Sequence, residues 1–409
     1  MKRWLAVSLC MAMLAGLGGC GKVDASDVQD LMANITPNPR SASALSEKDA
    51  ELLTAAAVKL LQNCDTSGNT LLSPFSVLCA VGMTANGAAG TTKAQLEEFF
   101  GMDTAELARC MQSWVQMQGG KEGLLSANSV WFCNDSLKVR NDFLQTNADY
   151  YGADVFQASF DENTCNELNR WVSEHTDGRI TELLDSIPEN AVMYLVNALC
   201  FRLRWAEPYT TNKVSPGVFT TQSGEERIVE MMSSREYLYL EDEAAIGFLK
   251  PYEDDQYAFA ALLPSEGVSM QEFLAGLDGE RLFSLLTGKR SESVRVLLPK
   301  FEAEYEAELS EAFRRMGVTE AFDPDAADFS RLGTAKDNLY ISRILHKTNI
   351  TVNETGTEAA AATAVEMMTK SARPMRDKSV VLDRPFVYMI VDLEANIPVF
   401  IGTVTDIGG

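Results

Sequence analysis

Hydrophobic positions recur at helical spacing in the first half of the chain. Residues 46–61 carry an apolar stripe behind a capping-box-like start, which predicts a helix that begins at Ser46. Residues 72–77 open a second helix, with serine at the cap and proline in the first turn. Thr164 and Glu167 are expected to frame a third helix, whose apolar residues include Leu168, Trp171 and Val172.

Strand patterns dominate the second half. A nearly continuous apolar run at residues 191–201 is typical of a strand that is buried on both faces. Other strands are predicted at residues 125–132, 245–249, 257–263, 294–298, 341–352, 386–393 and 399–404. Helices early and strands late indicate an α+β fold rather than alternating β-α-β units, and no interior linker is visible. We therefore expect one domain.

One segment fits neither pattern. After the strand-like residues 345–352, roughly 25 residues pass without a convincing core face, which is unusual inside a compact domain. The first part, residues 354–365, is nearly all small side chains, and the second part offers a basic residue, Lys370. Thr357 could cap an ordinary helix, because alanine, glutamate, methionine and lysine all favour helices. The other interpretation is a functional loop.

Composition narrows the function classes. The chain has 409 residues, of which 46% are hydrophobic and 23% charged, as in ordinary soluble domains. Its net charge of −23 argues against a nucleic-acid-binding surface, which needs clustered lysine and arginine.

The N-terminus predicts a targeting signal. Lys2 and Arg3 precede an apolar run at residues 4–17, too short to span a bilayer, and the sequence that follows, ending at Cys20, resembles a bacterial lipobox. This resemblance implies a signal peptide over residues 1–19 and lipidation of Cys20. The lipid would hold the protein on the outer face of the membrane, unless a released form is secreted.

Two further interpretations concern the same region. A plain secretory peptide with an incidental cysteine is the alternative to lipidation, and residues 20–44 are expected to form a flexible polar stalk in front of a domain at 45–409. Residues 16–21 match the G-x-G-x-x-G dinucleotide pattern, but no strand precedes them, so we reject a nucleotide site.

Six cysteines remain beyond the signal, and an exported protein could pair them. Cys79 lies in an apolar helix pattern and Cys200 in a strand pattern, where a free thiol serves as a small hydrophobic group. We therefore favour buried thiols over disulfides, and none of the spacings fits a zinc site.

Several blocks of sequence resemble the signatures of the serpin family, in the family's order, across most of residues 45–409. They are found at residues 73–77, 86–92, 197–209, 298–301, 346–361, 383–387 and 400–402. The resemblance implies a single α+β domain with helices packed on three β-sheets and an exposed reactive loop. It also implies a monomeric inhibitor of serine proteases that forms a covalent acyl complex and needs no cofactor or metal.

The resemblance assigns roles to individual residues. The loop hinge matches Glu354, Gly356, Thr357, Glu358, Ala359, Ala360, Ala361 and Ala362. A hydrogen-bonded cluster beneath the parting strands, which we call the shutter, matches Ser73, Ser76, Asn197 and His346. The point where insertion begins, the breach, matches Trp205, Lys300 and Glu354. Alternate hinge residues would face the interior of the sheet, where small side chains favour entry.

The family's spacing from the hinge glycine places the reactive bond between Lys370 and Ser371. Lysine there suits proteases with an acidic primary pocket, as in trypsin. The segment after Ser371 is longer than in well-known members. That leaves alternative sites for elastase-like, papain-like or trypsin-like proteases at Met367, Met368, Arg373 and Arg376. Arg373 ranks below Lys370 because proline follows it.

Two other classes compete with inhibition. A hydrolytic enzyme would need a nucleophile and base, yet the chain has no G-x-S-x-G or H-E-x-x-H motif, and its only histidines are His175 and His346. We therefore predict that the protein is not an enzyme. The second rival is a non-inhibitory serpin that is only cleaved or that binds a partner, but the alanine-rich hinge opposes it.

Overall fold

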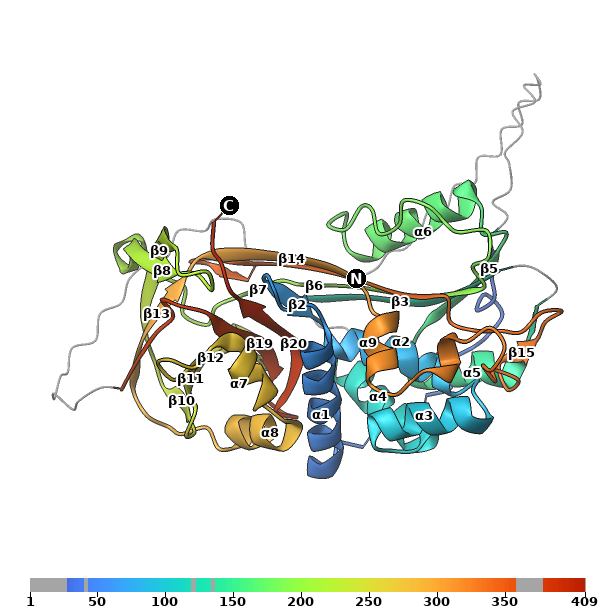
Figure 1. Ribbon diagram of the computed structural model, residues 1–409, viewed down its shortest axis with the longest axis horizontal. Helices are drawn as coiled ribbons and strands as arrows, with labels where there is room; N and C mark the ends of the chain where they lie inside the picture. Colours follow the sequence, from blue (N-terminus) through green and yellow to red (C-terminus); the bar gives the residue numbers. More distant parts are fainter. Residues whose placement is uncertain (1–27, 40–42, 119–122, 134–136, 358–377, 409) are drawn as a thin grey trace, which may run out of the picture.

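The computed structural model describes residues 28–39, 43–118, 123–133, 137–357 and 378–408. Three large β-sheets and the helices packed on them form the α+β fold that the sequence predicted (Figure 1). The largest sheet runs along the molecule, with α6 (Glu162–His175) on one face and α2 (Pro74–Ala85) among the helices on the other. A small two-stranded sheet completes the described architecture.

The largest sheet contains the line of contact between strands β6 and β16, which we call the seam. Its central strand β16 (Arg343–Val352) pairs in parallel with β6 (Met193–Phe201) over residues 343–349 and then pairs with the short strand β17 (Gly356–Thr357). β14 (Phe301–Glu308) also pairs with β16, in antiparallel orientation. Its strands in spatial order are β1 (Gln29–Asp30), β5 (Asp154–Ala158), β3 (Leu124–Cys133), β6 (Met193–Phe201), β16 (Arg343–Val352), β17 (Gly356–Thr357) and β7 (Leu203–Arg204), with β14 (Phe301–Glu308) beside β16.

The second and third sheets lie toward one end of the molecule, and the small sheet lies at the other end (Figure 1). The second sheet comprises β10 (Leu238–Glu241), β11 (Ala245–Pro251), β12 (Tyr257–Pro264), β19 (Phe386–Asp392), β20 (Ile397–Val404) and β2 (Thr70–Leu72). The third comprises β18 (Lys378–Val381), β13 (Val294–Pro299), β9 (Glu226–Glu236) and β8 (Val214–Thr220). The small sheet pairs β15 (Gly333–Thr334) with β4 (Lys138–Val139). Every residue of β12, β19 and β20 is buried, so these strands form a continuous core.

The helices confirm most of the predicted starts. α1 (Glu47–Asn63) begins with the expected capping box, in which Asp49 N–H donates to Ser46 Oγ. α2 has Ser73 at its N-cap and is buried along its whole length. The remaining α-helices are α3 (Gly90–Phe100), α4 (Thr104–Gln118), α5 (Asn141–Tyr150), α7 (Met270–Ala275), α8 (Gly279–Thr287) and α9 (Ser310–Arg315), and the short 3₁₀ turns are η1 (Thr211–Lys213) and η2 (Glu320–Phe322).

One predicted helix start is wrong. α6 begins at Glu162, because Asp161 caps it by accepting from Thr164 N–H at 2.9 Å. Aspartate is among the strongest capping residues, and it lies three residues before the threonine that was expected to begin the helix.

The stalk prediction is wrong for residues 28–39. β1 adds to the open edge of β5, and Leu31 N–H donates to Val155 O at 2.9 Å. Leu31, Met32 and Ile35 pack against the hydrophobic core. An exposed strand edge offers unpaired backbone groups, and these apolar residues supply the face that holds the segment there. Residues 20–27 and 40–42, together with the predicted signal peptide and Cys20, lie outside the described residues.

The six cysteines within the described residues are free thiols. Cys64, Cys79, Cys110, Cys133, Cys165 and Cys200 form no disulfide. Burial raises the pKa of the Cys64 and Cys110 thiols to about 12, so both stay protonated at neutral pH. Within the described part of the chain, none of the helices combines the length and apolar character needed to cross a bilayer.

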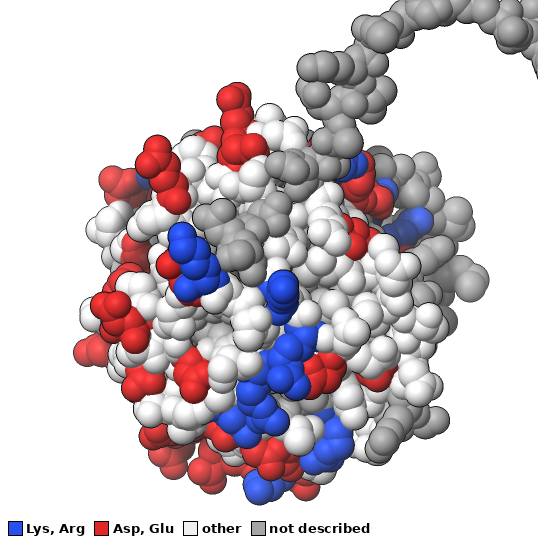
Figure 2. Space-filling model, turned by 90° about the vertical axis from the view of Figure 1, so that its right-hand side faces the viewer, with Lys and Arg blue, Asp and Glu red and all other residues white. Residues whose placement is uncertain are grey.

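Charge is distributed unevenly at the end of the molecule that carries α5 and β15. Figure 2 shows lysine and arginine side chains gathered toward the lower centre of this face, with acidic side chains around them. The negative net charge therefore does not cover this face uniformly.

Candidate functional site: the seam between β6 and β16

A buried hydrogen bond joins β6 to β16 in the lower half of the seam, by which we mean the half around His346 and Asn197. His346 on β16 lies opposite Asn197 on β6, and His346 Nδ1 is 2.8 Å from Asn197 Oδ1. His346 Nε2 accepts from Ser73 N–H at 3.2 Å. The second contact makes Nε2 the acceptor, so Nδ1 carries the proton and donates across the seam. The neutral imidazole thus satisfies both of its nitrogens.

The cluster around this bond links the strands β3, β6 and β16 to α2. The Asn197 side-chain amide donates to Ser76 Oγ and to Asn128 Oδ1, the latter at 2.7 Å. Ser76 Oγ also donates to Asn128 Oδ1 at 3.1 Å, and Ser73 Oγ donates to Val399 O at 3.1 Å. The structure therefore brings together all four residues that the resemblance assigned to the shutter.

Asn128 was missed by the sequence analysis. It lies on β3 directly opposite Asn197 and contacts both Asn197 and Ser76. An asparagine inside a predicted strand was the available signal, because amides are depleted from strands unless they have a specific partner.

Burial decides the charge of His346. Its side chain is 0% exposed, and this desolvation lowers its pKa from 6.5 to about 3. The imidazole is therefore neutral across the physiological range, as its hydrogen bonds require. Protonation would place an N–H at Nε2 against the N–H of Ser73 and break the cluster.

In the upper half of the seam, around Val352 and Leu203, the neighbouring strands are separated by β17. β17 lies between the end of β16 and β7, with Thr357 opposite Val352 on one side and Leu203 on the other. Gly356 faces Arg204, and a Cβ at Gly356 would lie 2.2 Å from Leu203 O. Only glycine permits this close approach of two backbones. Thr357 is therefore a strand residue, and the helix that the alternative interpretation would begin there lies outside the described residues.

A short turn feeds the chain into the opening. Asn353 Oδ1 accepts from Thr355 N–H at 2.9 Å and from Gly356 N–H at 3.3 Å. Trp205 fixes the turn from outside, because its indole N–H donates to Asn353 O at 2.8 Å and its backbone N–H donates to Thr355 O at 3.1 Å. The Trp205 ring is 1% exposed and stacks on Tyr252. Trp205 thus lies against the turn that leads into β17.

A charged pair lies beside the turn. Lys300 Nζ is 2.9 Å from Glu354 and 3.0 Å from Glu230. Burial opposes the charge on Lys300, but hydrogen bonds to Glu354 and Glu230 outweigh it and raise its pKa. Burial likewise opposes the charge on Glu354, yet its own backbone N–H and Lys300 together lower its pKa. Both side chains are partly exposed, so the pair contributes at most about 1 kcal/mol.

The rest of the predicted loop lies outside the described residues. This applies to Glu358, Ala359, Ala360, Ala361 and Ala362 of the hinge, to Lys370 and Ser371 of the reactive bond, and to Met367, Met368, Arg373 and Arg376 as alternative sites. Within the described ranges, no group of three or more histidine, cysteine or acidic residues is placed to bind a metal ion. His175 lies at the end of α6, with Nδ1 2.8 Å from Trp171 O.

Fold and seam together define an α+β protein whose largest sheet holds a short strand, β17, between β16 and β7 at one end. A family profile described as "Serpin (serine protease inhibitor)" matches residues 51–407. The chain belongs to the serpin family. It is 31% identical to the leukocyte elastase inhibitor of Bos taurus, over 82% of this chain and 92% of that protein. It is 28% identical to an uncharacterised serpin-like protein of Thermococcus kodakarensis, over 82% and 80%.

Two solved structures of one serpin, in different conformational states, can be compared with this structure. The native state of the thermophilic serpin Tengpin matches with a TM-score of 0.89 and 40% identity, covering 93% of this chain and all of that chain. The latent state of Tengpin matches with a TM-score of 0.79 and 39% identity, covering 90% and all of that chain. The structure described above is therefore more similar to the native state.

Proposed function

We propose that this serpin inhibits trypsin-like serine proteases as a suicide substrate. The protease attacks the Lys370–Ser371 bond, its serine forms an ester with the Lys370 carbonyl, and the chain beginning at Ser371 is released as the new amine. The severed loop then enters the largest sheet as a new strand and carries the protease with it. Serpin loop insertion is an established example of strand addition. The observation that carries the proposal is that Thr357 already lies between β16 and β7.

The register of β17 defines where an inserted strand would lie. Thr357 pairs antiparallel with one residue on β16 and one on β7. Every two residues further along the loop therefore move the facing position two residues back along each neighbour. Continued to residue 363, this register brings Thr363 opposite His346 and Asn197. A threonine hydroxyl at that point is able to take over the hydrogen bonds that insertion breaks, which supports the proposal.

The side chains and the energy both favour entry. Ala359, Ala361, Thr363 and Val365 would share the buried face of the new strand with Thr357, and none of them is bulky or charged. About ten new backbone hydrogen bonds at roughly 1 kcal/mol each would stabilise the inserted state by on the order of 10 kcal/mol. A gain of that size is comparable with the total stability of a domain, so insertion would be essentially irreversible.

A second target class has some support. Met367 and Met368 lie just before Lys370, and one relative is named a leukocyte elastase inhibitor. Elastase-like or papain-like proteases are therefore the second candidates. A protein that is only cleaved, without trapping its protease, is the non-inhibitory alternative.

Incubation with trypsin, elastase and papain tests these alternatives. On a denaturing gel, trypsin should give a covalent band whose mass is the sum of the protease and the cleaved inhibitor. Lys370→Gln should lose this band, whereas Arg376→Gln, which removes a nearby basic residue, should retain it. Complete cleavage near residue 370 with no such band, for every protease, would contradict the proposal.

We also propose that the inhibitor is a monomer without cofactor or metal, displayed on the outer face of the membrane through a lipid on Cys20. The lipobox-like sequence ending at Cys20 supports the anchor. Wild-type protein from its own type of host should partition into detergent, and Cys20→Ser should partition into water. Equal partitioning of both would indicate a plain secretory signal instead.

A further inference from the structure

The side chain of Thr357 makes a contact that the insertion mechanism does not itself explain. Its hydroxyl lies 2.5 Å from the hydroxyl of Tyr252, and both residues are 0% exposed. Tyr252 directly follows β11 of the second sheet, whereas Thr357 belongs to the largest sheet. One hydrogen bond therefore joins the start of the hinge to a different sheet.

The Tyr252 ring is held on two sides. It stacks on Trp205, with ring centroids 4.7 Å apart and planes 14° from parallel, and it meets Phe201 edge-on at 4.9 Å. Its backbone N–H donates to Tyr257 O at 3.0 Å. A ring packed in this way keeps its hydroxyl in place, so Thr357 has a fixed partner.

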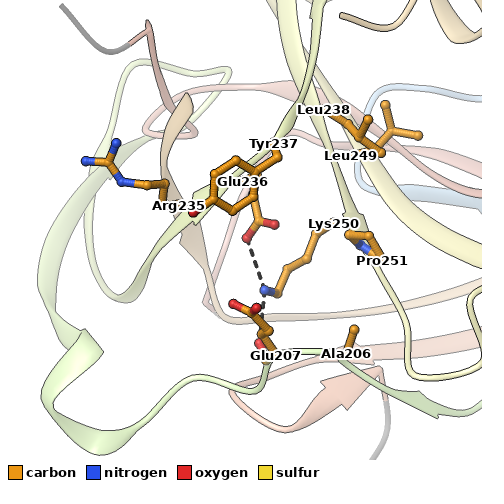
Figure 3. A pocket seen from close by; sticks show the side chains of 9 residues that line it. All are labelled: Ala206, Glu207, Arg235, Glu236, Tyr237, Leu238, Leu249, Lys250 and Pro251. Atoms are coloured by element: carbon orange, nitrogen blue, oxygen red, sulfur yellow. Dashed lines mark hydrogen bonds and ion pairs between the residues drawn. The ribbon is translucent and has the colours of Figure 1, made fainter. Parts of the chain in front are cut away.

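A buried ion pair supports Trp205 from behind. Lys250 is 2% exposed, and its ammonium donates to Glu236 at 3.0 Å and to Glu207 O at 3.1 Å. The ammonium also lies 5.4 Å from the centre of the Trp205 ring and 4.5 Å from that of Tyr209. Figure 3 shows Lys250 and Glu236 pointing toward each other. Both line a pocket of about 130 Å³. This cation–π arrangement restricts movement of Trp205 and hence of Tyr252.

We propose that Tyr252 is a positioning residue for loop insertion. Its hydroxyl holds Thr357 inside the sheet before cleavage and fixes the register from which the rest of the loop enters. This role rests on the proposed inhibitory function, because holding the hinge matters only if the loop inserts. The hydrogen bond itself belongs to the intact protein and is measurable without a protease.

Hydrogen exchange of the intact protein gives the first test. Tyr252→Phe should speed amide exchange in residues 356–357 by about two- to ten-fold, the range expected for the loss of one neutral hydrogen bond. The matched control is Tyr257→Phe. Tyr257 is also 0% exposed, and its hydroxyl has no hydrogen-bond partner among the described residues. The control should leave exchange at residues 356–357 unchanged.

A double variant makes the test specific to the pair. Thr357→Val and Tyr252→Phe each leave one buried hydroxyl without its hydrogen-bond partner, whereas the double variant removes both hydroxyls. Exchange in the double variant should therefore be no faster than in either single variant. If the two single effects multiply instead, the hydroxyls do not act together and the proposal is overturned.

Inhibition of trypsin gives the second readout. Tyr252→Phe should raise the number of inhibitor molecules consumed per trapped protease several-fold, with no change for Tyr257→Phe. Equal behaviour of these two variants in both assays would overturn the positioning role. If wild-type protein traps no protease while the exchange results hold, the inhibitory function fails and only the hinge contact stands.

Discussion

The two halves of the β6–β16 seam are held by different chemistry. In the lower half, His346 and Asn197 are 0% exposed and joined by a neutral, directional hydrogen bond. In the upper half, the strands are already parted around Thr357, and the neighbouring Lys300–Glu354 pair is partly exposed. Buried neutral bonds have fixed partners, whereas exposed ion pairs are exchanged readily for water. In the proposed mechanism, insertion would therefore start in the upper half, around Thr357, and be resisted at the shutter.

The largest effect is expected where the upper half receives the loop. Thr357→Arg would place a charge at a fully buried position without an anionic partner, which is strongly unfavourable. The hinge should leave the sheet, and the covalent complex with trypsin should fall by more than about ten-fold while cleavage continues. Gln271→Arg, at an exposed position on α7, makes the same change in charge and should retain full complex yield. An unchanged yield for Thr357→Arg would contradict insertion at this point.

The next effect concerns the shutter. Asn197→Ala removes the hydrogen bonds to His346, Ser76 and Asn128 and leaves buried groups without partners. The free energy of unfolding should fall by about 3 kcal/mol in urea titrations. The control is Asn190→Ala, at an exposed position before β6, which should change stability by less than about 0.5 kcal/mol. Similar losses for both variants would show that the lower half is not specially held.

Acid should loosen the lower half selectively. His346 has a pKa of about 3 in the folded protein and about 6.5 when unfolded, so between these pH values the unfolded chain binds a proton that the folded chain does not. Stability is therefore lost as pH falls below 6.5, by roughly 3 kcal/mol at pH 4. His346→Gln removes the titrating group and should lose correspondingly less stability between pH 7 and pH 4. His175→Gln, outside the seam, serves as the control.

The smallest effect belongs to the charged pair at the top. Lys300→Met should lower the free energy of unfolding by no more than about 1 kcal/mol, because Glu354 and Glu230 are partly exposed. High salt should reduce the difference from wild type, since screening weakens such pairs. A loss as large as that of Asn197→Ala, or one insensitive to salt, would remove the contrast between the two halves.

Most of the fold follows from local patterns, and the exceptions have physical reasons. The apolar run at residues 191–201 appears as β6, because a strand buried on both faces has a recognisable sequence. Tyr252 was not predicted, since its role depends on a contact 105 residues away between two sheets. β1 was missed because it forms only where the edge of β5 is available.

In the seam, too, what local sequence patterns predict differs from what depends on tertiary contacts. Ser73, Ser76, Asn197 and His346 could be assigned only through resemblance to a family, since each one alone looks like a helix cap or an ordinary strand residue. Their proximity follows from tertiary pairing of β6 with β16 above α2, which has no periodic signal along the chain. The buried contacts of Lys250 are likewise invisible in the sequence.

The central claim is that the intact protein is less stable than the form whose loop has entered the sheet. Limited cleavage beside Lys370, followed by thermal unfolding of the intact and cleaved proteins, tests it directly. About ten added hydrogen bonds should raise the melting temperature of the cleaved form by roughly 20 °C or more. A cleaved protein that melts at or below the temperature of the intact protein would contradict the account.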